Sequence, residues 1–349
     1  MSGFMTDVAA EPAVVRRVAA GAGGHLGERI DAAAAILRDR VELPVVVTGM
    51  GSSLSAGRVL HAVLVPAGRI VILEDAGELL HYGMGAAARV GCLVAVSQSG
   101  RSAETARVVE RFRSIGVPII AVVNDAESPV AAAADVVLDI GAGAEAAVAT
   151  RTFVASVAVL ALVAGRVVAG GPTVGDLAAV ADEMDLQLHE DSGTRAARHL
   201  AGCRAILVVG RGPALGAADY AALTIKETAA IPAESMSGGA FRHGPLELAA
   251  ADAGFVVIAP AGPTAAIAAG VAREVAALGR PTWLLASAGL AGAPDDPPTL
   301  LSAGIPDLHE ALAPLTCAVP LQQAAQELAR AAGRQAGVTV LATKVTDRE

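Results

Sequence analysis

Aromatic residues are scarce in this chain of 349 residues: one Trp, two Tyr and five Phe make up 2% of it. A core must therefore be built from the small aliphatic side chains that dominate the 54% hydrophobic fraction. Long apolar runs are missing as well. The longest covers residues 153–165, too short to span a bilayer, and predicts a buried helix. We expect no membrane partner.

Cysteine and positive charge are also low. The three cysteines, Cys92, Cys203 and Cys317, show no paired spacing, which predicts reduced thiols in a cytoplasmic protein rather than disulfides or a zinc site. The formal net charge is −9 and no basic block is present, which argues against nucleic acid as a partner. The first residues do not have the pattern of a secretion signal. The histidines lack metal-ligand spacing, so we expect neither a metal nor a cofactor.

The stretch from residue 93 to residue 106 joins a predicted strand to a predicted helix. Residues 93–96 form an apolar run typical of a buried strand, and a helical pattern starts at Ala103. Between them the sequence reads Ser97-Gln98-Ser99-Gly100-Arg101-Ser102. Three hydroxyls and the free N–H groups of the first helical turn would converge on one point and could hold a phosphate group. An ordinary connection with Ser as N-cap explains the spacing equally well.

Strands and helices alternate along the whole chain, which predicts a parallel, doubly wound sheet. The predicted strands of the first half cover residues 44–47, 69–73, 93–96, 118–123 and 136–140. In the second half we expect strands at residues 205–209, 255–259 and 282–286, and a last one near Leu308.

Two glycine pairs indicate an internal duplication. Gly49-Met50-Gly51 and Gly210-Arg211-Gly212 each follow an apolar strand and precede an Ala-rich helix, although two unrelated halves remain an alternative. We expect an N-terminal extension over residues 1–24, a first subdomain over 25–170, a connecting helix over 171–197 and a second subdomain over 198–349. Leu54 replaces the third glycine of a dinucleotide-binding fingerprint, which disfavours a dehydrogenase.

Two further residues are candidates for acid–base chemistry. Glu227 stands in an otherwise apolar predicted helix, and His243 lies between Gly238-Gly239 and Gly244-Pro245. An imidazole titrates near neutral pH, and a carboxylate becomes a better base where water is excluded. A solvated surface carboxylate and an exposed histidine are the simpler interpretations.

Residues 97–105, Glu227 and residues 241–245 together resemble the sugar isomerase (SIS) domain family. The resemblance is to the isomerase half of glucosamine-6-phosphate synthase and to free-standing amino-sugar-phosphate deaminases and isomerases. It implies an α/β fold of two flavodoxin-like SIS subdomains, each a five-stranded parallel sheet flanked by helices. It also implies a small-molecule sugar phosphate as the ligand and a homodimer as the assembly.

The resemblance assigns roles to individual residues of this chain. Glu227 would move the proton, Lys344 would contact the ketose carbonyl, and His243 would open the sugar ring in the site of the neighbouring subunit. The implied phosphate and sugar contacts are Ser53, Ser97, Gln98, Ser99, Ser102, Glu145, Val148 and Thr150.

One departure from the family pattern is Thr224, which stands where the synthase has a lysine. We also expect no glutaminase activity. The expected function is therefore a phosphosugar isomerase or deaminase that releases ammonia from an amino-hexose 6-phosphate in the cytoplasm. A fructosamine-6-phosphate deglycase and a non-catalytic phosphosugar-binding regulator are the alternatives.

Overall fold

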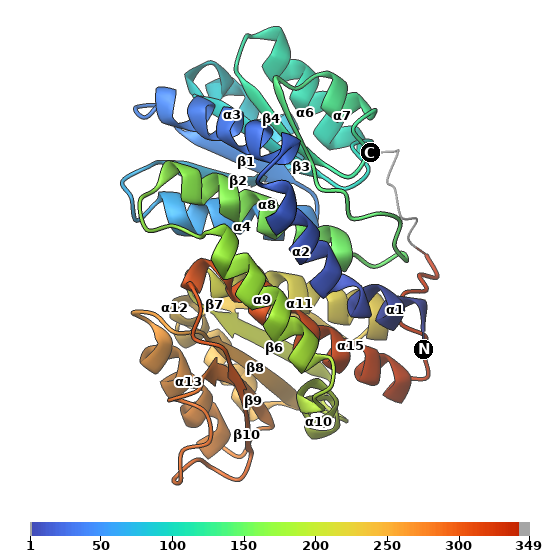
Figure 1. The fold of residues 1–349 in the computed structure, drawn as a ribbon. Coiled ribbons are helices and arrows are strands. Elements are labelled where there is room, and N and C mark those ends of the chain that lie inside the picture. Colours follow the sequence, from blue (N-terminus) through green and yellow to red (C-terminus); the bar gives the residue numbers. More distant parts are fainter. Residues whose placement is uncertain (1, 342–349) are drawn as a thin grey trace. The chain divides into compact units, whose positions relative to one another are not determined.

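The computed structural model describes residues 2–341, which divide into two compact units (Figure 1). The N-terminal unit comprises Ala13–Glu145 and Ala149–Ala178. The C-terminal unit comprises Ala179–Val340 together with the segments up to Pro12 and Ala146–Val148. Each unit contains one parallel five-stranded sheet flanked by helices, which confirms the predicted fold class.

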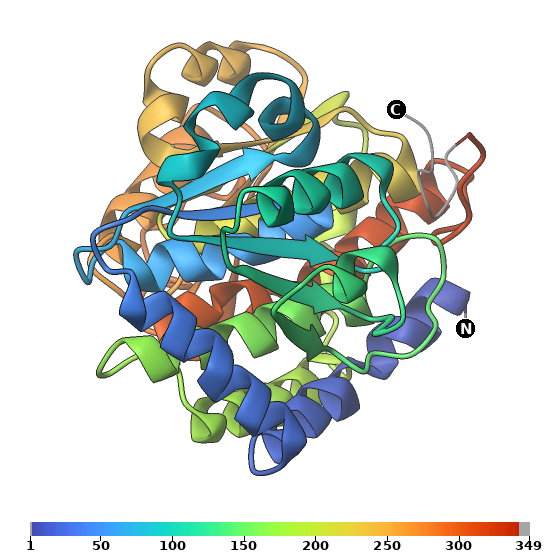
Figure 2. The ribbon, with the colours of Figure 1, turned by 90° about the horizontal axis from the view of Figure 1, so that it is seen from above.

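The sheet of the N-terminal unit has the strand order β2-β1-β3-β4-β5. Its strands are β1 (Val45–Gly49), β2 (Val71–Asp75), β3 (Cys92–Ser97), β4 (Ile119–Val123) and β5 (Val136–Asp139). The strands fan out in Figure 2, because a parallel sheet twists. The strand order reverses between β1 and β3, and ligands of such sheets bind at the carboxyl ends of the strands at this point.

Helices cover both faces of this first sheet. One face carries α3 (His25–Asp39), α4 (Ser52–Leu64) and α8 (Arg151–Val167). The other carries α5 (Ala76–Glu78), η1 (Leu79–Gly83), η2 (Met84–Arg89), α6 (Ala103–Ser114) and α7 (Pro129–Ala132). Helix α8 is buried without interruption from Thr152 to Ala164, which confirms the predicted buried helix. No helix within residues 2–341 is both long and apolar enough to cross a membrane.

The sheet of the C-terminal unit repeats the pattern, with the order β10-β9-β8-β6-β7. Its strands are β6 (Ala205–Gly210), β7 (Ala233–Ser237), β8 (Ala253–Ala259), β9 (Thr282–Ser287) and β10 (Leu300–Ile305). The sequence did not predict β7, and the strand expected near Leu308 is wrong. Leu308 follows Pro306, which cannot donate a ladder hydrogen bond, and the strand lies before it as β10.

The scarce aromatic rings are concentrated in the cores. Trp283, Tyr220, Phe241 and Phe255 are among the largest fully buried side chains, and the rings of Phe241 and Phe255 meet edge to face at 5.9 Å.

The helices of the C-terminal unit are α10 (Ser192–His199), α11 (Ala214–Ala229), α12 (Gly238–Arg242), η3 (Pro245–Ala250), α13 (Ala265–Ala277), η4 (Glu310–Leu312), α14 (Ala313–Thr316) and α15 (Ala318–Ala331). In addition, α1 (Gly3–Ala9) packs on α15, while α2 (Glu11–Gly21) and α9 (Val174–Gln187) run from one unit into the other.

Candidate active site

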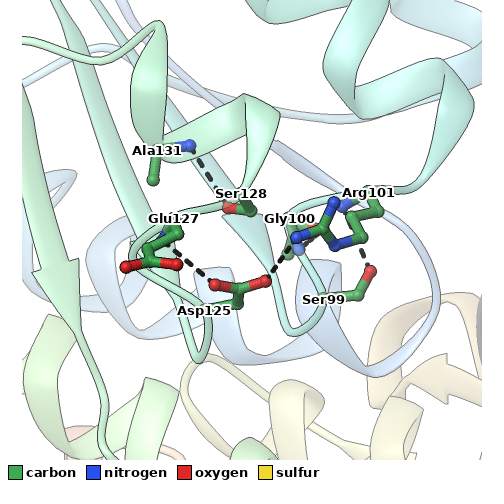
Figure 3. A network of polar contacts seen from close by, with 8 residues as sticks. Ser99, Gly100, Arg101, Asp125, Glu127, Ser128 and Ala131 are labelled. Atoms are coloured by element: carbon green, nitrogen blue, oxygen red, sulfur yellow. Dashed lines mark hydrogen bonds and ion pairs between the residues drawn. The ribbon is translucent and has the colours of Figure 1, made fainter.

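The serine loop, residues 97–102, connects the end of β3 to the start of α6. The Ser97 hydroxyl accepts a hydrogen bond from the Gly100 N–H at 3.1 Å. The Ser99 hydroxyl accepts one from the Arg101 N–H at 3.2 Å (Figure 3). Ser102 is the N-cap residue of α6, but its side chain makes no capping hydrogen bond. The first-turn N–H groups and the Ser102 hydroxyl are therefore placed to bind an anion at the positive end of the helix.

The serine loop is anchored on its neighbour, the loop that follows β4. The N–H of Val130, in α7, donates to the Gly100 carbonyl at 3.2 Å. The Arg101 guanidinium pairs with Asp125 at 2.8 Å (Figure 3). The hydrogen bond from Arg101 lowers the pKa of Asp125. Gly100 has a φ of +60°, and a Cβ there would lie 1.9 Å from the Ser128 hydroxyl oxygen. Only glycine fits this position without a shift of the loop.

A small hollow brings parts of three elements together in the N-terminal unit. Its lining residues are Ser52, Ser53, Gln98, Thr152, Phe153 and Ser156. Ser53 lies in the first turn of α4, and Gln98 lies in the serine loop. Two of the predicted phosphate-binding residues thus share one hollow beside the N-terminus of α8.

Glu145 caps the N-terminus of α8. Its carboxylate accepts hydrogen bonds from the backbone N–H groups of Thr150 at 3.1 Å and Thr152 at 3.0 Å, and from both threonine hydroxyls. A carboxylate at this end of a helix is stabilised by the free N–H groups and the helix dipole. Val148 and Thr150, two further predicted sugar contacts, are buried. Glu145 therefore fixes the fold of the segment that carries these two residues.

Glu227 is a half-buried carboxyl near the C-terminal end of α11. Burial raises its pKa to about 7, and the charge of the neighbouring Lys226 opposes this shift without cancelling it. Thr224, one helical turn earlier, is buried, and its hydroxyl oxygen has no hydrogen-bond partner among the described residues. A carboxyl group that titrates near pH 7 can both take up and return a proton under neutral conditions.

His243 is exposed at the C-terminal end of α12. Gly238 and Gly239, the glycine pair that precedes His243, do not lie in a loop. They begin α12, whose first turn is capped by the Ser237 hydroxyl. Gly244 then turns the chain with a φ of +123°. His243 is thus presented to solvent from a short ordered helix, while Lys344 lies outside the described residues.

The structure brings only some of the predicted residues together. The serine loop, Ser53 and Glu145 belong to the N-terminal unit, whereas Glu227 and His243 belong to the C-terminal unit. The candidate phosphate-binding residues thus lie in the N-terminal unit, and the candidate proton-transfer residues lie in the C-terminal unit.

Sequence reasoning missed Asn124, which follows β4 directly. Its backbone N–H donates to the Gln98 carbonyl at 3.1 Å, and its side chain bonds Ala142 and Gly143. The sequence feature that could have identified Asn124 is its position directly after β4. Because β4 is adjacent to β3, the carboxyl ends of both strands lie at the same edge of the sheet.

Within residues 2–341, no group of three or more His, Cys, Asp or Glu side chains is arranged to hold a metal ion. Cys92, Cys203 and Cys317 are unpaired. Burial raises the pKa of the Cys92 and Cys317 thiols to about 12, so both remain protonated near neutral pH.

Two α/β units, each with a parallel five-stranded sheet flanked by helices, define a doubly wound, flavodoxin-like fold class. The family model of the SIS domain matches residues 42–166 and 199–294, more than half of the chain. The chain therefore belongs to the SIS domain family.

Sequence similarity to a curated protein supports the same family. A glutamine–fructose-6-phosphate aminotransferase (isomerizing) of Zymomonas mobilis is 30% identical over 301 residues, which cover 82% of this chain and 49% of that protein. The chain thus spans about half the length of this curated relative.

Solved structures resemble the fold over almost all of the chain. Tagatose-6-phosphate ketose/aldose isomerase from Escherichia coli matches with a TM-score of 0.81 and 16% identity, covering 97% of this chain and 96% of its own. Glucosamine-6-phosphate deaminase from Thermotoga maritima matches with a TM-score of 0.70 and 16% identity, covering 92% and 98%. At these identities, the likeness is one of fold.

Proposed function

We propose that this chain is an amino-sugar-phosphate isomerase of the deaminase type. The observation that carries the proposal is the half-buried Glu227, whose pKa of about 7 suits a group that moves protons near neutral pH. Membership of the SIS domain family supports a phosphorylated sugar as the substrate. Two solved structures of the same fold are those of an aldose–ketose isomerase and a deaminase, which supports isomerisation followed by deamination as the reaction.

The phosphate group would bind at the serine loop. With a net charge of −9, the chain as a whole repels an anion, so a local set of donors must hold it. The proposed donors are the first-turn N–H groups of α6 and the hydroxyls and amide of the predicted contacts. These contacts are Ser53, Ser97, Gln98, Ser99 and Ser102.

The reaction would proceed by proton transfers on the open-chain sugar. His243 would move a proton between the ring oxygen and the hydroxyl on carbon 1, which opens the ring. Glu227 would remove the proton from carbon 2 and return it to carbon 1, which converts the aldehyde and amine into a hydroxymethyl group and an imine. Water would then add to the imine carbon and ammonia would leave, giving the ketose phosphate. Positioned proton transfer of this kind contributes roughly 10²–10⁴-fold in rate.

The remaining predicted residues would contact the sugar. We propose that Lys344 polarises the carbonyl or imine, and that Glu145, Val148 and Thr150 line the sugar. Thr224 stands in place of the synthase lysine, so this chain lacks one cationic group near Glu227. The three unpaired cysteines fit a reducing compartment, and we propose that the protein works in the cytoplasm.

A panel assay of amine release tests the proposal. We expect the purified chain to release ammonia from glucosamine 6-phosphate or galactosamine 6-phosphate, measured with a coupled ammonia assay, without added metal or cofactor. Release of lysine from fructoselysine 6-phosphate would instead identify a deglycase. Binding of these sugars without turnover would identify a regulator, and failure to bind any of them would refute the proposal.

The assembly can be tested by mixing inactive subunits. We propose a homodimer in which His243 acts in the site of the partner chain. Glu227→Gln and His243→Ala should each be inactive alone. After the two are unfolded and refolded together, hybrid dimers should regain about a quarter of wild-type activity, because half of the dimers would contain one intact site of two. No regain would show that His243 serves its own chain.

A further inference from the structure

We infer that Asn124 is a positioning residue, which fixes the distance between the phosphate-binding serine loop and the sugar-contact segment that follows β5. The inference rests on the proposed function, because it assigns the two segments to one substrate. It assigns no chemical step to Asn124 itself.

The first observation is that Asn124 bonds to both segments at once. Its backbone N–H donates to the Gln98 carbonyl of the serine loop at 3.1 Å. Its side-chain oxygen accepts from the Ala142 N–H at 2.7 Å, and its side-chain nitrogen donates to the Gly143 carbonyl at 2.9 Å. One half-buried residue therefore joins the loops that follow β3 and β5.

The second observation is that the segment from Gly141 to Thr150 has no regular secondary structure of its own. Gly141 and Gly143 both have positive φ, at +54° and +74°, so the backbone alone does not define its path. Hydrogen bonds from side chains define the path of this segment instead, because a loop outside the sheet needs other partners for its backbone groups.

The far end of this segment is fixed separately. The Asp7 carboxylate accepts a hydrogen bond from the Ala146 N–H at 2.6 Å, and the Glu145 carboxylate caps α8. At the near end, Asp139 and Arg17 bond to Gly141, whereas Ala142 and Gly143 are held by the Asn124 side chain. Its loss should let Ala142 and Gly143 move while the far end and the serine loop remain in place.

The test compares Asn124→Ala with Asn124→Asp in the full chain. Alanine removes both side-chain hydrogen bonds, whereas aspartate keeps an acceptor for Ala142 and loses the donor to Gly143. The backbone hydrogen bond to Gln98 persists in both variants, so the serine loop should remain intact. We expect the Kd for glucosamine 6-phosphate to rise roughly tenfold in the alanine variant and less in the aspartate variant. The Kd for inorganic phosphate should stay within about twofold of the wild type.

A second readout does not depend on any sugar. Hydrogen exchange at the Ala142 amide should accelerate in Asn124→Ala and remain slow in Asn124→Asp. Equal loss of affinity for both ligands, or unchanged exchange at Ala142, would overturn the inference. If the wild-type chain binds none of the amino-sugar phosphates, the proposed function fails, but the exchange experiment still decides whether Asn124 holds the segment.

Discussion

Glu227→Gln should abolish turnover while leaving the binding of the sugar phosphate almost unchanged. The amide has the size and shape of the carboxyl group but can neither take up nor return the proton between carbons 1 and 2. We expect the turnover number to fall on the order of 10²–10⁴-fold, the usual contribution of a positioned acid–base group. The Kd for the substrate, measured by calorimetry, should stay within about threefold, because the phosphate is proposed to bind at the serine loop.

The pH dependence of the wild type gives this prediction a second measurement. Because burial raises the pKa of Glu227 to about 7, the basic form that starts the reaction dominates only above that pH. The wild-type kcat/KM should therefore fall about tenfold per pH unit below pH 7. The residual activity of Glu227→Gln should not show this decrease.

The same raised pKa makes Glu227 costly for stability. Its folded-state pKa lies above the unfolded value of 4.5, so the native state binds the proton more tightly. The free energy of unfolding should thus fall as the pH rises from 4.5 to 7, by on the order of 3 kcal/mol. Glu227→Gln removes this penalty and should melt at a higher temperature than the wild type at pH 8, but not at pH 4.5.

Glu183→Gln is the matched control for these measurements. Glu183 also has a raised pKa, caused first by burial and then by the nearby Glu190, but it lies on α9 and carries no proposed role. The control should keep full turnover. If Glu227→Gln turns over substrate as fast as the control, the proton-transfer assignment is wrong.

The central strands of both sheets could be predicted because they are buried on both faces. Such strands contain apolar runs, which cover residues 45–47 in β1, 92–96 in β3 and 255–259 in β8. The two edge strands of the second sheet behave differently. Most residues of β7 and β10 are at least partly exposed, and polar residues such as Glu234 and Ser302 interrupt the pattern. A search for apolar runs therefore missed β7 and misplaced β10.

In the candidate site, too, the sequence indicates the residue types, whereas several contacts arise only when the chain is folded. The run of serines before a helix could be identified from the sequence, and so could the position of Glu227 in an otherwise apolar helix. The inward bond of the Ser97 hydroxyl to Gly100 depends on the backbone turn at Gly100, which residue types do not specify. The partners of Asn124 lie 18 and 19 residues further along the chain, so only the folded sheet brings them together.

Gly100→Ala should remove most of the affinity for phosphorylated sugars. An alanine at a φ of +60° is disfavoured by roughly 1–2 kcal/mol. In addition, its Cβ would lie 1.9 Å from the hydroxyl oxygen and 2.4 Å from the Cβ of Ser128, which is fully buried and caps α7. Since neither residue can yield locally, we expect the serine loop to lift away from α7. Losing two charge-assisted hydrogen bonds to the phosphate would weaken binding on the order of a hundredfold or more.

Gly116→Ala separates the cost of the backbone angle from the cost of the clash. Gly116 also has a positive φ, +75°, but a Cβ there would meet nothing within 4 Å. The positive φ should lower the free energy of unfolding of this variant about as much as it does in Gly100→Ala. The affinities for glucosamine 6-phosphate and for inorganic phosphate, both measured by calorimetry, should stay unchanged. Adding Ser128→Gly to Gly100→Ala removes the obstructing atoms and should restore part of the lost affinity, beyond what additive effects predict. Equal affinities in Gly100→Ala and Gly116→Ala would show that the phosphate does not bind at the serine loop, because the position of that loop would then have no effect on the ligand.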